Sequence, residues 1–434
     1  MTVVVPELVL GPDARVSRGV AVELRDGHVT SLLSSADAPD DALRLPRRLL
    51  VPGLVNAHSH AFQRALRGRV ERIDPEHPHD DFWTWREEMY AAATALDPAG
   101  VRLATEACFR EARAAGYTTV GEFHYVHHQP DGTPYDDPNA LAHAVIDAAH
   151  ATGIRLVLLP TAYARAGHGL PPTPGQRRFC DASVEAYLAR IDALRAEVED
   201  DPLVTIAYAP HSVRAVPRDW LEQISRHAAE TGLPVHVHAD EQPREIDESL
   251  AEHGLRPIAL LDACGLLSER TTIIHATHAD DAELDLMAER GATVCACPST
   301  EANLGDGSLP AERLWARGVP VAFGADSNTR LDPFEEARET EGLARRAAGR
   351  RNVLVRPGED GPARSLWECL TVNGSRALGL ATGAIAVGAP ADLVALDLDH
   401  AEISDVPAEH LAAAVLFSGS AALVRETFVA GQIS

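Results

Sequence analysis

Residues 50–60 have the sequence LVPGLVNAHSH, in which a short apolar run leads directly into two histidines. The run at 50–57 predicts a buried strand. Seven more runs of this kind follow, separated by helical patterns: residues 118–123, 155–161, 204–210, 234–239, 271–277, 293–299 and 320–326. Strands that alternate with helices form parallel sheets. Eight in succession predict a (β/α)8 barrel, whose active site lies at the C-terminal ends of the strands.

The two ends of the chain differ from this pattern. Residues 1–49 and 385–434 hold short strand-like runs separated by turns. Neither end is long enough to bury a good core alone, so we expect one small β-sandwich domain built from both. The barrel domain is then expected to span residues 50–384. A Gly/Pro-rich tract at 164–179 follows the third strand and predicts a loop near the active face.

The composition excludes several classes of function. All 39 basic residues of the 434-residue chain are arginines, so no lysine can form a Schiff base, a phosphate-binding loop or a carbamylated bridge between two metals. The 64 acidic residues give a net charge of −25, which argues against nucleic acid or an anionic membrane as a partner. The N-terminus has neither the pattern of a signal peptide nor a spanning apolar run. The six scattered cysteines fit buried thiols, and we expect a soluble, cytoplasmic protein.

Histidines and carboxylates gather at the ends of the predicted strands. His58 and His60 are two residues apart, so one metal ion can take both. The ends of later strands carry further candidates: His238 with Glu241 three residues on, His275, and Asp326. Each alone fits an ordinary role, such as a core histidine, a helix N-cap or a solvated carboxylate. Together on one face of a barrel, the imidazoles and carboxylates suit water activated by zinc.

Seven loop segments carry a resemblance that extends over the whole chain: HSHAFQR (58–64), FWTWREEMY (82–90), GYTTVGEFHYVHH (116–128), HSVRAV (211–216), HADEQ (238–242), HATHAD (275–280) and NLGDG (303–307). The chain resembles the amidohydrolase superfamily and, within it, the formimidoylglutamate deiminases of histidine degradation. One departure is Asp240, because members of that family carry two apolar residues between the ligand histidine and the catalytic glutamate.

The resemblance implies one Zn²⁺ per chain, held by His58, His60, His238 and Asp326. Where two-metal branches carry a carbamylated lysine, this chain has Ala-Pro-His at 209–211, which agrees with a single metal. The resemblance also implies the catalytic roles. Asp326 and His275 would orient the water and take its proton, and Glu241 would carry a proton to the departing nitrogen. The products would be N-formyl-L-glutamate and ammonia.

A substrate with two carboxylates needs cations, and arginine binds carboxylates well through its bidentate fork. The resemblance assigns the substrate contacts to Gln63, Arg86, Tyr125, His211 and Arg214. We expect Trp83 and Trp85 to pack within their loop and His236 to fill a deeper, structural layer of the barrel.

Two other interpretations stay open. An aminohydrolase of the same branch that acts on a purine, a pyrimidine or an s-triazine would have an aromatic-rich pocket without an arginine pair. A catalytically dead barrel kept as a binding protein would have lost part of the ligand set, whereas every expected position is filled here. The sequence does not distinguish zinc from iron. The resemblance also implies a homodimer.

Overall fold

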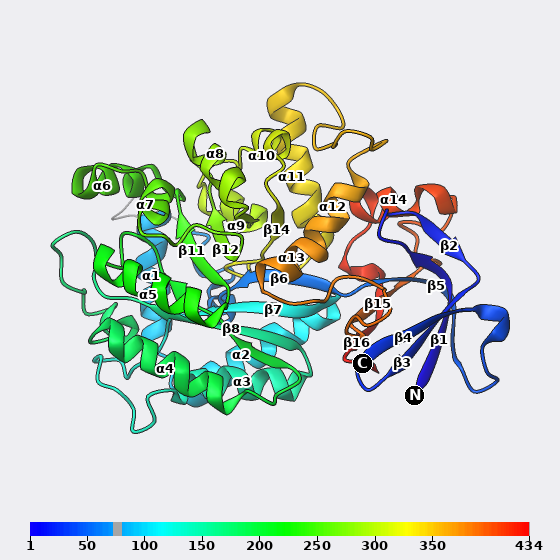
Figure 1. Cartoon of the computed structure of the whole chain (residues 1–434), viewed down its shortest axis with the longest axis horizontal. Coiled ribbons are helices and arrows are strands. Elements are labelled where there is room, and N and C mark those ends of the chain that lie inside the picture. Colours follow the sequence, from blue (N-terminus) through cyan, green and yellow to red (C-terminus); the bar gives the residue numbers. More distant parts are fainter. Residues whose placement is uncertain (73–79, 434) are drawn as a thin grey trace.

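The computed structural model describes residues 1–72 and 80–433 of the chain. Its centre is a ring of parallel strands (Figure 1). The strands are β6 (Leu54–Ser59), β7 (Tyr117–His124), β8 (Arg155–Ala162), β9 (Val204–Ile206) with β10 (Ala209–Pro210), β11 (Val235–Ala239), β12 (Thr271–His275), β13 (Thr293–Ala296) and β14 (Val321–Phe323).

Hydrogen bonds join these strands in two runs, β10–β8–β7–β6 with β9 on β8, and β11–β12–β13–β14. Bridges from Ser59 to Asp326 and from Tyr208 to Val235 connect the two runs on both sides. The ring of strands is therefore closed, and the predicted (β/α)8 barrel is confirmed. The eight predicted runs coincide with the barrel strands, although their bounds differ by a few residues.

The largest difference in bounds concerns the run predicted at 50–57. The structure divides it between β5 (Leu43–Pro52), which belongs to the sheet of the chain ends, and β6. Gly53 lies at the junction, where a Cβ atom would stand 2.9 Å from the carbonyl oxygen of Asp392 and would overlap the Thr118 side chain. Only glycine fits this close approach between the two sheets.

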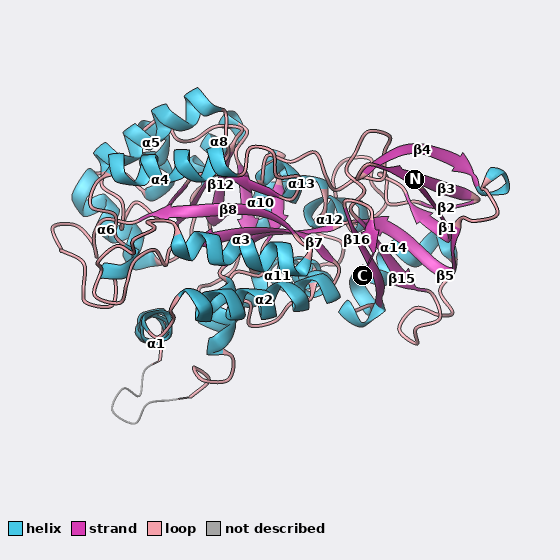
Figure 2. Ribbon diagram, turned by 90° about the horizontal axis from the view of Figure 1, so that it is seen from below, coloured by secondary structure: helices cyan, strands magenta, loops and turns pink. Residues whose placement is uncertain are grey.

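Helices lie around the ring of barrel strands (Figure 2). They are α1 (Phe82–Thr94), α2 (Pro98–Ala114), α3 (Ala140–Thr152), α4 (Val184–Glu197), α5 (Arg218–Thr231), α6 (Pro243–His253), α7 (Pro257–Ala263), α8 (Asp281–Arg290), α9 (Pro298–Leu304), α10 (Ala311–Arg317), α11 (Pro333–Ala348), α12 (Ala363–Leu370), α13 (Val372–Ala377) and α14 (Leu411–Ser418). The helical patterns that the sequence carries at 98–116, 136–153 and 217–232 correspond to α2, α3 and α5. No helix in the described part of the chain is long and apolar enough to cross a membrane.

Both ends of the chain build a single sheet beside the barrel (Figure 1). Its strands run in the order β17–β16–β15–β5–β1–β3–β4, with β2 on β1. The strands not yet defined are β1 (Thr2–Leu10), β2 (Val16–Arg18), β3 (Val20–Arg25), β4 (His28–Ser34), β15 (Leu393–Asp397), β16 (Val424–Val429) and β17 (Gln432–Ile433). Apolar residues of both ends share a small core, in which Val22 and Leu24 join Leu393 and Phe428. The proposed domain limits, 1–49 plus 385–434 and 50–384, stay a prediction.

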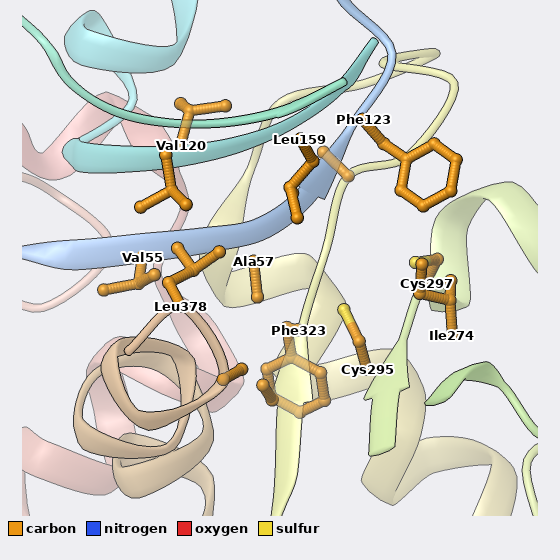
Figure 3. Close-up of a cluster of buried hydrophobic side chains, with 14 of the residues drawn as sticks. Val55, Ala57, Val120, Phe123, Leu159, Ile274, Cys295, Cys297, Phe323 and Leu378 are labelled. Atoms are coloured by element: carbon orange, nitrogen blue, oxygen red, sulfur yellow. The ribbon is translucent and has the colours of Figure 1, made fainter. Parts of the chain in front are cut away.

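The barrel has a much larger core of its own. Figure 3 shows part of it, where Val55 and Ala57 of β6 lie near Val120 of β7 and Phe323 of β14. Cys295 of β13 fills the same region as a small apolar residue. The cysteines are free thiols, and all but Cys180 are buried.

Candidate metal and catalytic centre

The ends of three barrel strands bring the predicted ligands together. His58 lies in β6 and His60 directly follows it, His238 lies in β11, and Asp326 follows β14. The Nε2 atoms of His58 and His238 are 3.2 Å apart. Asp326 Oδ1 lies 3.5 Å from His58 Nε2 and 3.3 Å from His60 Nε2. Side chains from both halves of the sequence therefore converge on one point inside the mouth of the barrel.

The electrostatics of this cluster suit a metal cation. Burial lowers the pKa of His58 to about 3 and lowers the pKa values of His60 and His238, so the rings are neutral at physiological pH. The Nδ1 atoms of His60 and His238 lie 2.8 and 3.0 Å from backbone carbonyl oxygens, which places their protons on Nδ1 and leaves Nε2 free to donate electrons. Burial alone would raise the pKa of Asp326, but the adjacent histidines outweigh it and hold that pKa below its usual range.

Three imidazole nitrogens and one carboxylate form a donor set that fits Zn²⁺. His236, in contrast, lies away from this cluster. Its Nε2 atom is 2.7 Å from the carbonyl oxygen of Ala377, and the residue is fully buried. This contact fits the structural role expected for His236.

His275 and Glu241 lie beside the ligand cluster. His275 Nε2 is 3.5 Å from Glu241 Oε1 and 3.7 Å from Asp326 Oδ2. Burial lowers the pKa of His275, but the surrounding carboxylates outweigh it and raise this pKa well above the usual value. Burial raises the pKa of Glu241, against the opposing charge of His275. The two groups can therefore exchange protons with a molecule held between them.

Several of these residues have a strained backbone. The φ angles of Asp240, His275 and Asp326 are 55°, 71° and 47°, in the left-handed region that favours glycine. Such strain costs about 1–3 kcal/mol per residue and clusters at functional sites. Each strained residue lies just past the end of its strand or at its last position, where the chain turns away from the barrel.

A cavity of about 50 Å³ opens on the cluster. Its walls include all five residues predicted to contact substrate: Gln63, Arg86, Tyr125, His211 and Arg214. Gln63 Nε2 donates a 2.6 Å hydrogen bond to Tyr125 Oη. The His211 and His238 rings are stacked with their centroids 5.0 Å apart. The structure therefore brings the predicted substrate residues to the predicted ligands.

The arginines of the cavity lie over Trp83. The Cζ atoms of Arg86 and Arg214 are 4.6 and 5.3 Å from the centre of the Trp83 ring system. Arg214 is 8% exposed, and among the described residues no carboxylate lies within ion-pairing distance of it. Its Nε atom also has no hydrogen-bond partner. Burial lowers the pKa of Arg214, but the charges of the groups around it, among them Glu245 and Glu241, outweigh burial and raise that pKa. The guanidinium therefore stays charged and can pair with an anion that enters the cavity.

Sequence reasoning missed several residues of the cavity wall, namely Phe82, Met89, Tyr90, Tyr163, Phe179 and Leu304. Trp85 also lines the cavity, whereas we expected it only to pack within its loop. Gln176 Nε2 donates hydrogen bonds to Tyr163 Oη at 2.8 Å and to Tyr90 Oη at 3.1 Å. Because Gln176 belongs to the tract at 164–179, the predicted loop does reach the active face.

Asp240, the departure from the family pattern, does not line the cavity. Its carboxyl group is fully buried, and its Oδ1 atom lies 3.9 Å from Arg256 Nη2. Burial, helped by the charge of Glu283, raises the pKa of Asp240 to about 10. This shift favours the neutral form of the carboxyl group.

Comparison with known proteins agrees with this arrangement. The model of the Amidohydrolase family matches residues 49–434. The chain belongs to the amidohydrolase family. This amidohydrolase is 40% identical over 418 residues to formimidoylglutamate deiminase of Pseudomonas aeruginosa, covering 96% of this chain and 91% of the relative. It is therefore a hydrolase that acts on C–N bonds.

Two solved structures share its fold. An amidohydrolase from Brucella melitensis superposes with a TM-score of 0.90 at 33% identity, over 100% of this chain and 94% of the other. An adenosine deaminase from Xanthomonas campestris, solved with bound zinc, has a TM-score of 0.84 at 28% identity, over 100% of this chain and 92% of the other. The relatives are thus deaminating enzymes as well as a deiminase.

Proposed function

We propose that this amidohydrolase hydrolyses N-formimidoyl-L-glutamate to N-formyl-L-glutamate and ammonia. The observation that carries the proposal is the buried Arg214, which has no carboxylate of the described residues within ion-pairing distance and shares the cavity wall with Arg86. Two arginines on one wall suit a substrate with two carboxylates. The similarity to formimidoylglutamate deiminase supports the same substrate.

In this proposal His58, His60, His238 and Asp326 hold one Zn²⁺. When bound, the ion supplies Lewis-acid chemistry that makes water a nucleophile near neutral pH. Asp326 and His275 orient the attacking water and take its proton, since their side chains lie 3.7 Å apart. The water oxygen forms a bond to the formimidoyl carbon. Glu241 delivers a proton to the terminal nitrogen, whose bond to that carbon breaks as ammonia leaves.

The residues of the outer cavity bind the rest of the substrate. Arg214 holds one carboxylate, and Arg86, with Gln63 near it, is the candidate for the other. Tyr125 donates or accepts a hydrogen bond through the hydroxyl that Gln63 already contacts at 2.6 Å. Burial and the charge of Arg214 lower the pKa of His211 well below its usual value, so this ring is neutral and can accept a hydrogen bond from an N–H of the formimidoyl group.

The second candidate is deamination of a purine, which the similarity to an adenosine deaminase favours. The cavity does contain aromatic side chains, among them Tyr125, Tyr163 and Phe179. A neutral purine, however, leaves the charge of Arg214 without a partner. The substrate carboxylates therefore separate the two candidates.

The test is ammonia release by the purified protein from N-formimidoyl-L-glutamate and from adenosine, with metals quantified in the same preparation. We expect turnover of the formimidoyl compound and about one zinc per chain, since four ligands are available. Turnover of adenosine alone would overturn the substrate assignment. Two tightly bound metals per chain would overturn the single-zinc site.

We further propose that the enzyme acts in the cytoplasm, in histidine degradation, as a homodimer. This assignment rests on the family resemblance and on the free cysteine thiols of the described chain. Light scattering of the purified protein tests the dimer, and a monomeric mass would contradict it.

A further inference from the structure

A buried carboxylate lies behind the catalytic histidine. Glu301, in α9, is 2% exposed, and its Oε1 atom is 3.3 Å from His275 Nδ1. The other ring nitrogen, His275 Nε2, lies 3.5 Å from Glu241 Oε1 and 3.7 Å from Asp326 Oδ2. The imidazole thus bridges Glu301 on one side and the reacting groups on the other.

Glu301 is itself held in place. Its Oε1 atom accepts a 2.9 Å hydrogen bond from the backbone N–H of Cys297, at the start of α9. Its Oε2 atom is buried without a hydrogen-bond partner in the described chain. A carboxylate fixed in this way next to Nδ1 keeps a proton on that nitrogen and fixes the orientation of the ring.

We propose that Glu301 is a positioning residue for the deimination reaction. It holds the Nδ1 proton of His275, so that the proton which the ring gains and loses is the one on Nε2. That nitrogen faces Glu241 and Asp326, between which the attacking water is placed in the proposed function on which this inference rests. Without Glu301 the ring can turn or take the other tautomer, and Nε2 then no longer receives the proton of the water.

The same contacts also fit a cation site, and an experiment has to distinguish that role from positioning. His275, Cys297 and Glu301 each offer one ligand atom within 4.8 Å of the others, which is close enough to hold a cation. The thiol argues against this, because burial raises the pKa of Cys297 well above its usual value and only the thiolate binds metals strongly. A second metal in the wild-type protein that disappears on replacing Glu301 would overturn the positioning role.

The kinetic test compares Glu301→Met with Glu336→Met. Glu336 is a matched control, because it also binds the start of α9: it accepts a 2.9 Å hydrogen bond from the Ser299 N–H but does not touch His275. We expect Glu301→Met to lower kcat about 10- to 100-fold, with KM and zinc content within twofold of the wild type. Glu301→Gln keeps an acceptor and should retain more activity. An equal loss in Glu336→Met would mean that Glu301 only anchors α9.

A double-mutant cycle with His275→Ala asks whether Glu301 acts through the ring. In the His275→Ala background, replacing Glu301 should change kcat less than twofold. A loss as large as in the wild-type background would overturn the proposal.

A measurement without turnover separates this inference from the proposed substrate. In protein labelled with ¹⁵N-histidine, the ring signals that vanish in His275→Ala belong to His275. In spectra recorded at a pH above the pKa of the ring, where the imidazole is neutral, we expect them to report a proton on Nδ1 in the wild type and a mixture of tautomers in Glu301→Met. Unchanged signals in Glu301→Met would overturn the positioning role. If the wild type fails to hydrolyse N-formimidoyl-L-glutamate, the substrate proposal fails, and these signals still decide the role of Glu301.

Discussion

Glu241 follows β11 and Glu245 lies in the first turn of α6, and both are buried, yet only Glu241 lines the cavity. Glu245 instead accepts a 3.3 Å hydrogen bond from the backbone N–H of Glu241. Burial raises the pKa of Glu245 to about 7 and also raises the pKa of Glu241. Similar shifts therefore accompany different roles, and geometry has to decide between them.

We expect Glu241→Gln to keep its zinc and to lose about 10²–10⁴-fold in kcat, because it removes a proton carrier without removing a ligand. Glu245→Gln is the control and should lose less than tenfold. Steady-state kinetics with metal analysis of both variants provide the measurement. If Glu241→Gln turns over near the wild-type rate, another group carries the proton.

Arg214→Met should lower kcat/KM without changing the metal content. A charge-assisted hydrogen bond contributes about 1.5–3 kcal/mol, so the expected loss is roughly 10- to 150-fold. Arg244→Met is a matched control: Arg244 also lies over Trp83, at 4.4 Å, but it is exposed and paired with Glu248. Arg244→Met should lower kcat/KM only slightly, because an exposed ion pair contributes little.

The loss on Arg214→Met should shrink for an analogue that lacks the carboxylate held by Arg214. Comparing wild type and variant on mono-carboxylate analogues identifies that carboxylate. Equal losses on every analogue would show that Arg214 supports the loop and does not bind substrate.

Among the elements, the barrel strands and the main helices could be predicted because local patterns encode them. Each strand is a short apolar run, and the ligands directly follow the runs. The end of β5 at Pro52 could not be predicted, because it depends on the approach of Asp392 from the far end of the sequence. The hydrogen bonds that Gln176 donates to Tyr90 and Tyr163 likewise join three distant segments, so no local sequence pattern predicts them.

The close packing of β14 against β6 predicts the effect of a substitution at Gly324. A Cβ atom on Gly324 would lie 2.7 Å from His58 Cβ, 2.9 Å from His58 O and 3.1 Å from Cys295 Sγ. Gly324→Ala should therefore displace His58 and lower zinc affinity about 10- to 100-fold, as for other changes that disturb the support of a ligand. Chelator competition measures this.

Gly361→Ala is the control for this substitution, because a Cβ atom there meets nothing within 4 Å. Its zinc affinity should equal that of the wild type. If Gly324→Ala also binds zinc as tightly as the wild type, the closeness of the two strands does not hold His58 in place.

In the molecule as a whole, the ion pair of Arg155 with the buried Asp392 connects the sheet of the chain ends to the barrel. Arg155 at the start of β8 donates to both carboxylate oxygens of Asp392, at 2.7 and 3.1 Å. Asp392 is 1% exposed and also accepts a 2.8 Å hydrogen bond from the Ala430 N–H. Removing one partner of a buried pair leaves the other charge uncompensated, which is more costly than losing an exposed pair.

We therefore expect Arg155→Met to destabilise the protein by about 3–5 kcal/mol. The exposed pair of Arg47 with Asp399, at 2.8 Å, also joins the two ends of the chain, so Arg47→Met is the control and should barely change the unfolding midpoint. Adding Asp392→Asn to Arg155→Met should restore part of the loss, because it neutralises the orphaned carboxylate while keeping an acceptor for Ala430. Thermal and denaturant unfolding of the four proteins, wild type included, measure the differences. If Arg155→Met has the same unfolding midpoint as Arg47→Met, the Arg155–Asp392 pair does not couple the sheet to the barrel, and apolar packing alone joins them.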